Sequence, residues 1–119
     1  MAQRKVRVRR KSQQESPLSR QITRGVRFLN REYGRSWLRN IRMETLALGE
    51  DTVCVLGQLE GDYTQALEVF GQDAAWARKH GFTTSSDVDD PFWAQLTKAW
   101  KRRIAAERHE RGVVVVEGV

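Results

Sequence analysis

The chain has 119 residues, with 21 Lys or Arg side chains against 15 Asp or Glu, for a formal net charge of +6 at pH 7. This length suits one domain around a single core. Neither a secretory signal nor an apolar run long enough to span a membrane is present, and the single cysteine, Cys54, excludes an internal disulfide. The sequence therefore predicts a cytoplasmic protein that has no membrane span.

The positive charge is concentrated at the N-terminus. Residues 1–29 carry nine basic side chains and one acidic side chain, whereas residues 30–119 carry 12 basic and 14 acidic side chains, for a net charge of −2. Residues 1–17 also offer almost no apolar surface, so ordering them would cost entropy that burial does not offset. We expect a disordered basic arm over 1–17, a helical domain over 18–110 and a short extended tail over 111–119.

The first helical pattern follows the arm. Apolar side chains recur at i, i+4, i+7 and i+11 over residues 19–33, at Ile22, Val26, Leu29 and Tyr33. This spacing predicts one buried helix face, closed by Gly34 as a C-terminal cap. Residues 35–50 sustain no period, which favours a short helical turn followed by irregular chain.

The stretch TVCVLGQLEGDYTQALEVFG predicts two short helices and a tight turn. Asp51 is the expected cap of a helix over 52–60, and Gly57 in its middle predicts a second helix passing close. Gly61 and Asp62 predict the turn and the cap of a helix over 63–70. The glycines and apolar positions also fit a DNA-reading helix-turn-helix, but the second helix carries no Lys or Arg, so helix packing is favoured.

Two further helices complete the pattern. Asp73 can begin a helix around Trp76, and Asp90 followed by Pro91 predicts the start of a last helix that ends near Arg108. The fold class is therefore all-α, a single small domain of about five helices. Its predicted core comprises Val26, Leu29, Val53, Leu56, Leu59, Leu67, Phe70, Trp76, Leu96 and Trp100. The four consecutive valines near the C-terminus favour an edge strand, a partner-binding tail or an aggregation-prone end.

No enzymatic chemistry is predicted. Two separated histidines, His80 and His109, and one cysteine do not supply a zinc site, and no phosphate-binding glycine loop or nucleophile elbow is present. We therefore expect no catalytic residue, no metal and no cofactor. The acidic segment around Asp87, Asp89 and Asp90 could hold a cation, but complementing the dipole of the following helix is its more ordinary role.

The arm carries the functional hypothesis. Six basic side chains within eight residues would bind nucleic acid phosphates by releasing counterions, without base specificity, although a solvated tail has the same composition. A second run at 101–103 would extend this footprint if it faced the same way as the arm; otherwise it is the exposed side of an amphipathic helix. The candidate nucleic-acid-binding residues are Arg4, Lys5, Arg7, Arg9, Arg10, Lys11, Lys101, Arg102 and Arg103.

Trp93 carries the alternative. It lies one step off the apolar stripe of the last helix, so we expect it to be partly exposed and to mark a partner surface. The chain would then be a protein-interaction module that binds a host or phage protein through Trp93, the valine tail or the acidic loop. Binding to nucleic acid should weaken steeply with salt, whereas an apolar protein interface should not.

Several motifs resemble those of small uncharacterised proteins from actinobacteria and their phages. The shared features are the C-V-L-G-Q segment, the G-D-Y turn, the H-G-F loop and a closing L-T-x-A-W helix, across about residues 24–104. The resemblance implies an origin and no particular activity. It does not extend to the basic arm.

Overall fold

The computed structural model describes residues 16–84, 90–110 and 112, and these residues form helices without any strand. The elements are α3 (Pro17–Tyr33), the 3-10 turn η1 (Gly34–Ser36), α4 (Trp37–Asn40), α5 (Val55–Glu60), α6 (Tyr63–Phe70), α7 (Ala74–Lys79) and α8 (Asp90–Glu110). The all-α fold class is thus confirmed. Residues 1–15 of the predicted arm and almost all of the predicted tail lie outside the described part.

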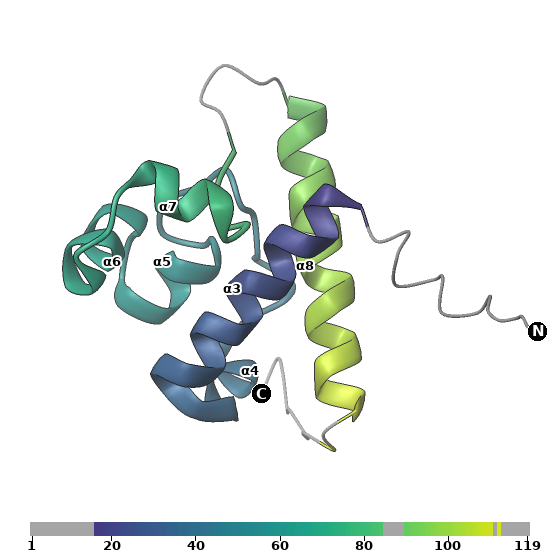
Figure 1. Cartoon of the computed structure of the whole chain (residues 1–119). Helices are drawn as coiled ribbons and strands as arrows, with labels where there is room; N and C mark the ends of the chain where they lie inside the picture. The colour runs from purple at the N-terminus through teal and green to yellow at the C-terminus, as the bar shows by residue number, and fades with distance from the viewer. Residues whose placement is uncertain (1–15, 85–89, 111, 113–119) are drawn as a thin grey trace, which may run out of the picture.

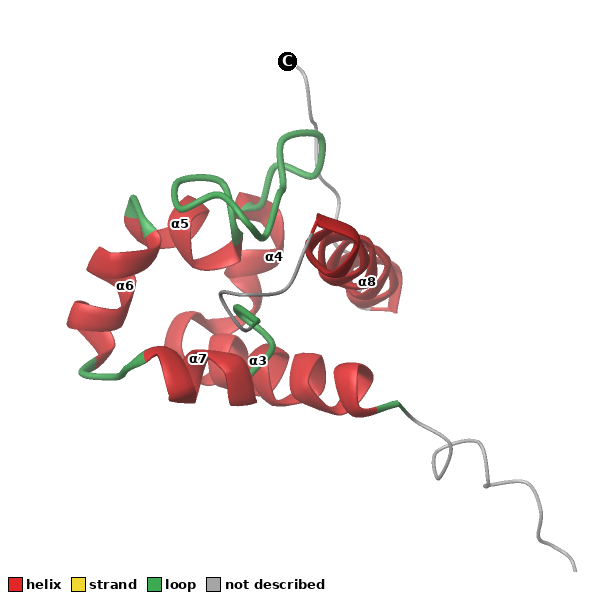
Figure 2. Cartoon of the chain, turned by 90° about the horizontal axis from the view of Figure 1, so that it is seen from above, coloured by secondary structure: helices red, strands yellow, loops and turns green. Residues whose placement is uncertain are grey.

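The two long helices frame the domain. Helix α8 lies on one side of α3, and the short helices α5, α6 and α7 form a group on the other side (Figure 1). In the view from above, α3 runs along one edge of the domain, with α5 and α6 toward one end of it and α8, seen nearly end-on, near the other (Figure 2). The N-terminal end of α3, where the predicted arm would enter the domain, is thus beside α8.

Helix α3 follows its predicted pattern and begins two residues early. The Ser16 hydroxyl accepts a hydrogen bond of 3.0 Å from the Ser19 amide, and Pro17 occupies the first turn. The helix buries Ile22, Val26 and Leu29, as the spacing predicts. Its end at Gly34 has a φ of 69°, a conformation that favours glycine.

Helix α5 differs from its prediction in its N-terminal cap and in the reason for its central glycine. Its N-cap is Cys54, whose sulfur accepts a 3.2 Å hydrogen bond from the Gly57 amide, so Asp51 is not the cap. A Cβ at Gly57 would lie 2.1 Å from the Asp51 carbonyl oxygen. The glycine is therefore required by the turn that precedes its own helix, and the predicted neighbouring helix is wrong.

Helices α6 and α7 begin as the sequence predicts. The Asp62 carboxylate accepts a 2.7 Å hydrogen bond from the Gln65 amide, and the Asp73 carboxylate accepts a 3.0 Å bond from the Trp76 amide. Each bond satisfies one of the amides that a helix start leaves without a partner. Helix α8 includes Asp90 as its first residue, which shifts the predicted start by one position.

The core draws on every helix and on the aperiodic segment. Of the predicted core, Val26, Leu29, Leu56, Leu96 and Trp100 are buried, while Leu59, Leu67, Phe70 and Trp76 are half-buried against it. The prediction of Val53 as a core residue is wrong, because Val53 is partly exposed in the turn before α5 and does not pack against this core. Additional buried side chains include Trp37, Leu38, Ile41, Leu46, Leu48, Phe82 and Ile104.

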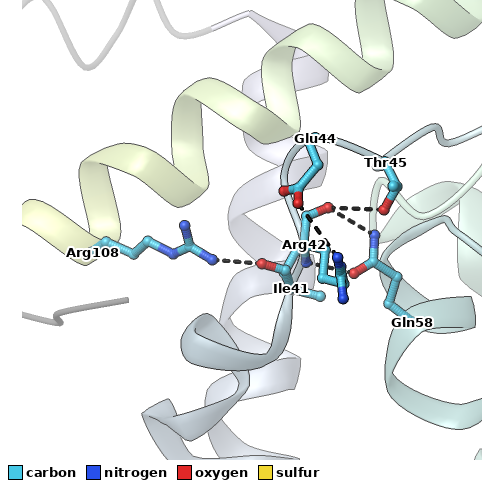
Figure 3. Close-up of polar contacts among 6 residues, drawn as sticks. All are labelled: Ile41, Arg42, Glu44, Thr45, Gln58 and Arg108. Carbon is cyan, nitrogen blue, oxygen red and sulfur yellow. Dashed lines mark hydrogen bonds and ion pairs between the residues drawn. The ribbon is translucent and has the colours of Figure 1, made fainter. Parts of the chain in front are cut away.

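The end of α8 holds the chain that leaves α4. The Arg108 guanidinium donates hydrogen bonds to the carbonyl oxygens of Leu38, at 2.9 Å, and Ile41, at 2.7 Å. From the other side, the Gln58 side chain accepts from the Arg42 amide at 2.6 Å and donates to the Arg42 carbonyl at 3.2 Å (Figure 3). These bonds pair polar backbone groups that no secondary structure satisfies.

Replacing Arg108 by methionine should therefore destabilise the domain. The variant keeps an unbranched apolar side chain but leaves two carbonyl oxygens without their charged donor, at a cost of roughly 1.5–3 kcal/mol. Urea unfolding followed by circular dichroism measures the change. The exposed Arg39→Met variant is the matched control and should change stability by no more than about 0.5 kcal/mol. Equal stability of the two variants would contradict the proposed role of Arg108.

Candidate nucleic-acid interface

The arginines of α3 form a stripe along its solvent-exposed face. Arg20, Arg24, Arg27 and Arg31 recur at i, i+4, i+7 and i+11, and all four are exposed. With 3.6 residues per turn, this α3 arginine stripe lies opposite the buried apolar face and extends for about 16 Å. The basic residues predicted in the arm, Arg4 to Lys11, precede this helix in the chain and lie outside the described residues.

Helix α7 flanks the stripe on one side. The Nε atom of Arg24 donates a 2.8 Å hydrogen bond to the carbonyl oxygen of Lys79, in the last turn of α7. Arg78 and Lys79 are both exposed at this helix end. The contact therefore brings the end of α7, which carries these two cations, against α3.

Helix α8 flanks α3 on the other side with part of the predicted second patch. Arg102 and Arg103 line a hollow of about 390 Å³ together with Ser16 and Ser19 at the start of α3. Arg103 also donates a 3.0 Å hydrogen bond to the Thr23 hydroxyl and forms a 3.2 Å ion pair with Glu107. Arg102 is thus the exposed cation here, while Arg103 also joins α8 to α3.

Lys101 lies apart from this pair. Successive residues of a helix are rotated by about 100°, so three consecutive side chains cannot share one face. Lys101 instead lines a groove of about 690 Å³ on α8, together with Trp93, the predicted partner-binding residue. Trp93 is partly exposed, as the sequence predicts. Its role in binding stays a prediction.

The α3 arginine stripe is absent from the nucleic-acid-binding residues predicted from the sequence. The apolar spacing of residues 19–33 predicts the buried face of this helix. Arginine recurs at the same intervals, and each arginine lies two positions before an apolar residue of that face. That second periodicity was available in the sequence. Its position beside α7 and Arg102 was not, because those neighbours come from distant parts of the chain.

The pKa values of Cys54 and Tyr33 are raised, and both side chains have structural roles. Burial is the main cause that raises the pKa of the Cys54 thiol, which keeps it protonated as the cap of α5. Burial likewise raises the pKa of Tyr33, and the hydrogen bond that its hydroxyl donates to Glu60 raises it further. Tyr33 thereby links α3 to α5.

Metal-ligating side chains do not gather in threes anywhere in residues 16–84 and 90–110. Within the same ranges, each helix is too short or too polar to cross a bilayer. Asp87 and Asp89, from the acidic loop considered for a cation, lie outside the described residues. No family model, curated protein or solved structure matches the chain, so the resemblance to actinobacterial and phage proteins stays a prediction.

Proposed function

We propose that the chain is a non-enzymatic accessory protein that binds the phosphate backbone of nucleic acid through its basic N-terminal residues and the α3 arginine stripe. The α3 arginine stripe is the observation that carries the proposal. Four exposed arginines recur on one helix face, and the planar guanidinium group has a geometry that suits phosphate oxygens. Binding would gain free energy by releasing the counterions condensed on the nucleic acid.

The surroundings of the stripe support this function. The end of α7, with the exposed Arg78 and Lys79, contacts α3 on one side, and Arg102 lies on the other. The six basic residues between Arg4 and Lys11 precede the N-terminal end of α3 by a few positions in the chain. These charges would form one continuous positive surface. Such a surface positions a protein on a nucleic acid without reading its sequence.

Two variants with the same charge change test the proposal. Arg27→Gln/Arg31→Gln removes two cations from the stripe, while Arg39→Gln/Arg42→Gln removes two exposed cations at α4 and the segment after it. Arg24 is retained because of its bond to Lys79. Binding of the full chain to a random duplex and a random single strand is measured by fluorescence anisotropy across a salt series.

The stripe variant should bind both nucleic acids more weakly and with a shallower salt dependence. The slope of log K against log salt on the duplex should fall by about 0.9 for each lost phosphate contact. The control variant should change much less. A chain with the wild-type stripe that begins at Ser16 should also show a shallower salt dependence than the full chain, because it lacks the basic residues between Arg4 and Lys11. Equal losses in the two double variants would refute the stripe, and salt-insensitive capture of a protein would favour the protein-interaction module.

A further inference from the structure

The groove on α8 holds an indole ring in a fixed position. The Leu48 amide donates a 2.9 Å hydrogen bond to the Thr97 hydroxyl, which ties the segment around residues 47–50 to α8. Gly49 lies directly on the ring of Trp93, because a Cβ there would be 3.2 Å from its Cδ2 atom. The remaining exposed part of the ring lines the groove. The aromatic surface is therefore held in place by packing.

Cations border this ring. Lys98 and Lys101 line the same groove, against one acidic side chain, Glu50. Lys98 is exposed and lies one helical turn before Arg102, which borders the hollow at the start of α3. Positive charge thus continues from the α3 arginine stripe over α8 to the edge of the groove.

The lining suits a flat ligand with an adjoining anion. Trp93 is the single large apolar side chain among the described residues that line the groove, and its other walls come from alanine, glycine, threonine and charged residues. A helical peptide would need several apolar anchor pockets along its length. A nucleobase needs one aromatic face, with cations nearby for its phosphate.

We propose that this groove binds one unpaired base of a single-stranded nucleic acid, stacked on Trp93 with the adjoining phosphates on Lys98 and Lys101. The proposal rests on the proposed function and deepens it into a preference for single strands. Bases of a duplex are already stacked on one another and are not available to a ring in a groove. Phosphate contacts at the α3 arginine stripe would serve both forms of nucleic acid.

Trp93→Leu tests the stacking, because leucine retains apolar bulk but has no aromatic face. The matched control is Phe92→Leu, which removes a more exposed aromatic ring, 55% exposed, from the neighbouring position of α8. Phe92 borders a different hollow, near Leu18. Anisotropy titrations of the full chain use an oligothymidylate of about 12 nucleotides and a duplex of the same length.

The wild-type chain should prefer the single strand. Trp93→Leu should lower its affinity for oligothymidylate about fivefold or more and leave duplex affinity unchanged. Phe92→Leu should change neither. Oligothymidylate should also quench tryptophan fluorescence in the wild type but much less in Trp93→Leu, since Trp37 and Trp100 are fully buried and the partly exposed Trp76 does not line the groove.

A second variant keeps the test valid if Trp93→Leu does not fold. Lys98→Gln/Lys101→Gln should weaken single-strand binding more than duplex binding, because both side chains line the groove. If both groove variants kept the wild-type preference for the single strand, the groove proposal would be overturned. The proposed function would still stand if the stripe variant bound more weakly than its control. Absence of wild-type binding to either nucleic acid at low salt would overturn both proposals.

Discussion

Replacing Gly25 by alanine should destabilise the domain by roughly 3 kcal/mol or more. Helix propensity alone predicts the opposite, because alanine is favoured over glycine within a helix by about 1 kcal/mol. In the folded chain, a Cβ at Gly25 would lie 2.3 Å from the carbonyl oxygen of His80 and 3.1 Å from the ring of Trp100. The alanine could fit only if the end of α7 or the core indole moved.

Urea denaturation of Gly25→Ala and Gly34→Ala separates steric conflict from backbone preference. Gly34 has a φ of 69° and no atom within 4 Å of an added Cβ, so its alanine variant should cost only about 1–2 kcal/mol. Gly25 lies within α3, where alanine adopts the helical conformation without strain. If Gly25→Ala were as stable as the wild type, the close approach of α7 to α3 would be wrong.

Trp100→Ala should be the second severe substitution, at about 3–5 kcal/mol. The side chain is fully buried, its ring stacks on Phe82 with centroids 5.6 Å apart, and it meets Trp37 edge to face at 6.5 Å. Its Nε1 donates a 2.6 Å hydrogen bond to the carbonyl oxygen of Gly81. Truncation would remove the contact between α8 and the turn after α7 and leave a large cavity.

Trp100→Phe distinguishes the hydrogen bond from the packing. Phenylalanine retains much of the aromatic volume but cannot donate to the Gly81 carbonyl. We therefore expect Trp100→Phe to lose less stability than Trp100→Ala, and at least the roughly 1–3 kcal/mol of one unsatisfied buried acceptor. Thermal unfolding should show the same order, with about 4–8 °C lost for each kcal/mol in a domain of this size. Wild-type stability of Trp100→Phe would refute a structural role for this bond.

The two substitutions probe the same junction. Gly25 lies in α3, Trp100 lies in α8, and both contact the chain at the end of α7 between His80 and Phe82. This junction sets the position of α8 relative to α3. The spacing between the α3 arginine stripe and the cations of α8 therefore depends on it.

The sequence alone determined the features that depend on neighbouring residues. The apolar period of α3, the Asp62 and Asp73 caps and the extent of α8 all follow from side chains within a few positions of one another. The all-α class is the sum of these local signals. The arginine period of α3 is a local signal of the same kind, so the sequence alone is enough to predict the stripe.

Only the tertiary structure decided what distant segments do to each other. The aperiodic segment after α3 supplies the buried Leu46 and Leu48, and Gly57 is explained by a turn that no period indicates. The division of the second basic patch, with Lys101 beside Trp93 and Arg102 beside α3, likewise depends on how α8 is rotated. The physical reason is that packing depends on contacts between residues far apart in the chain. A local sequence pattern does not specify which distant residues will be in contact.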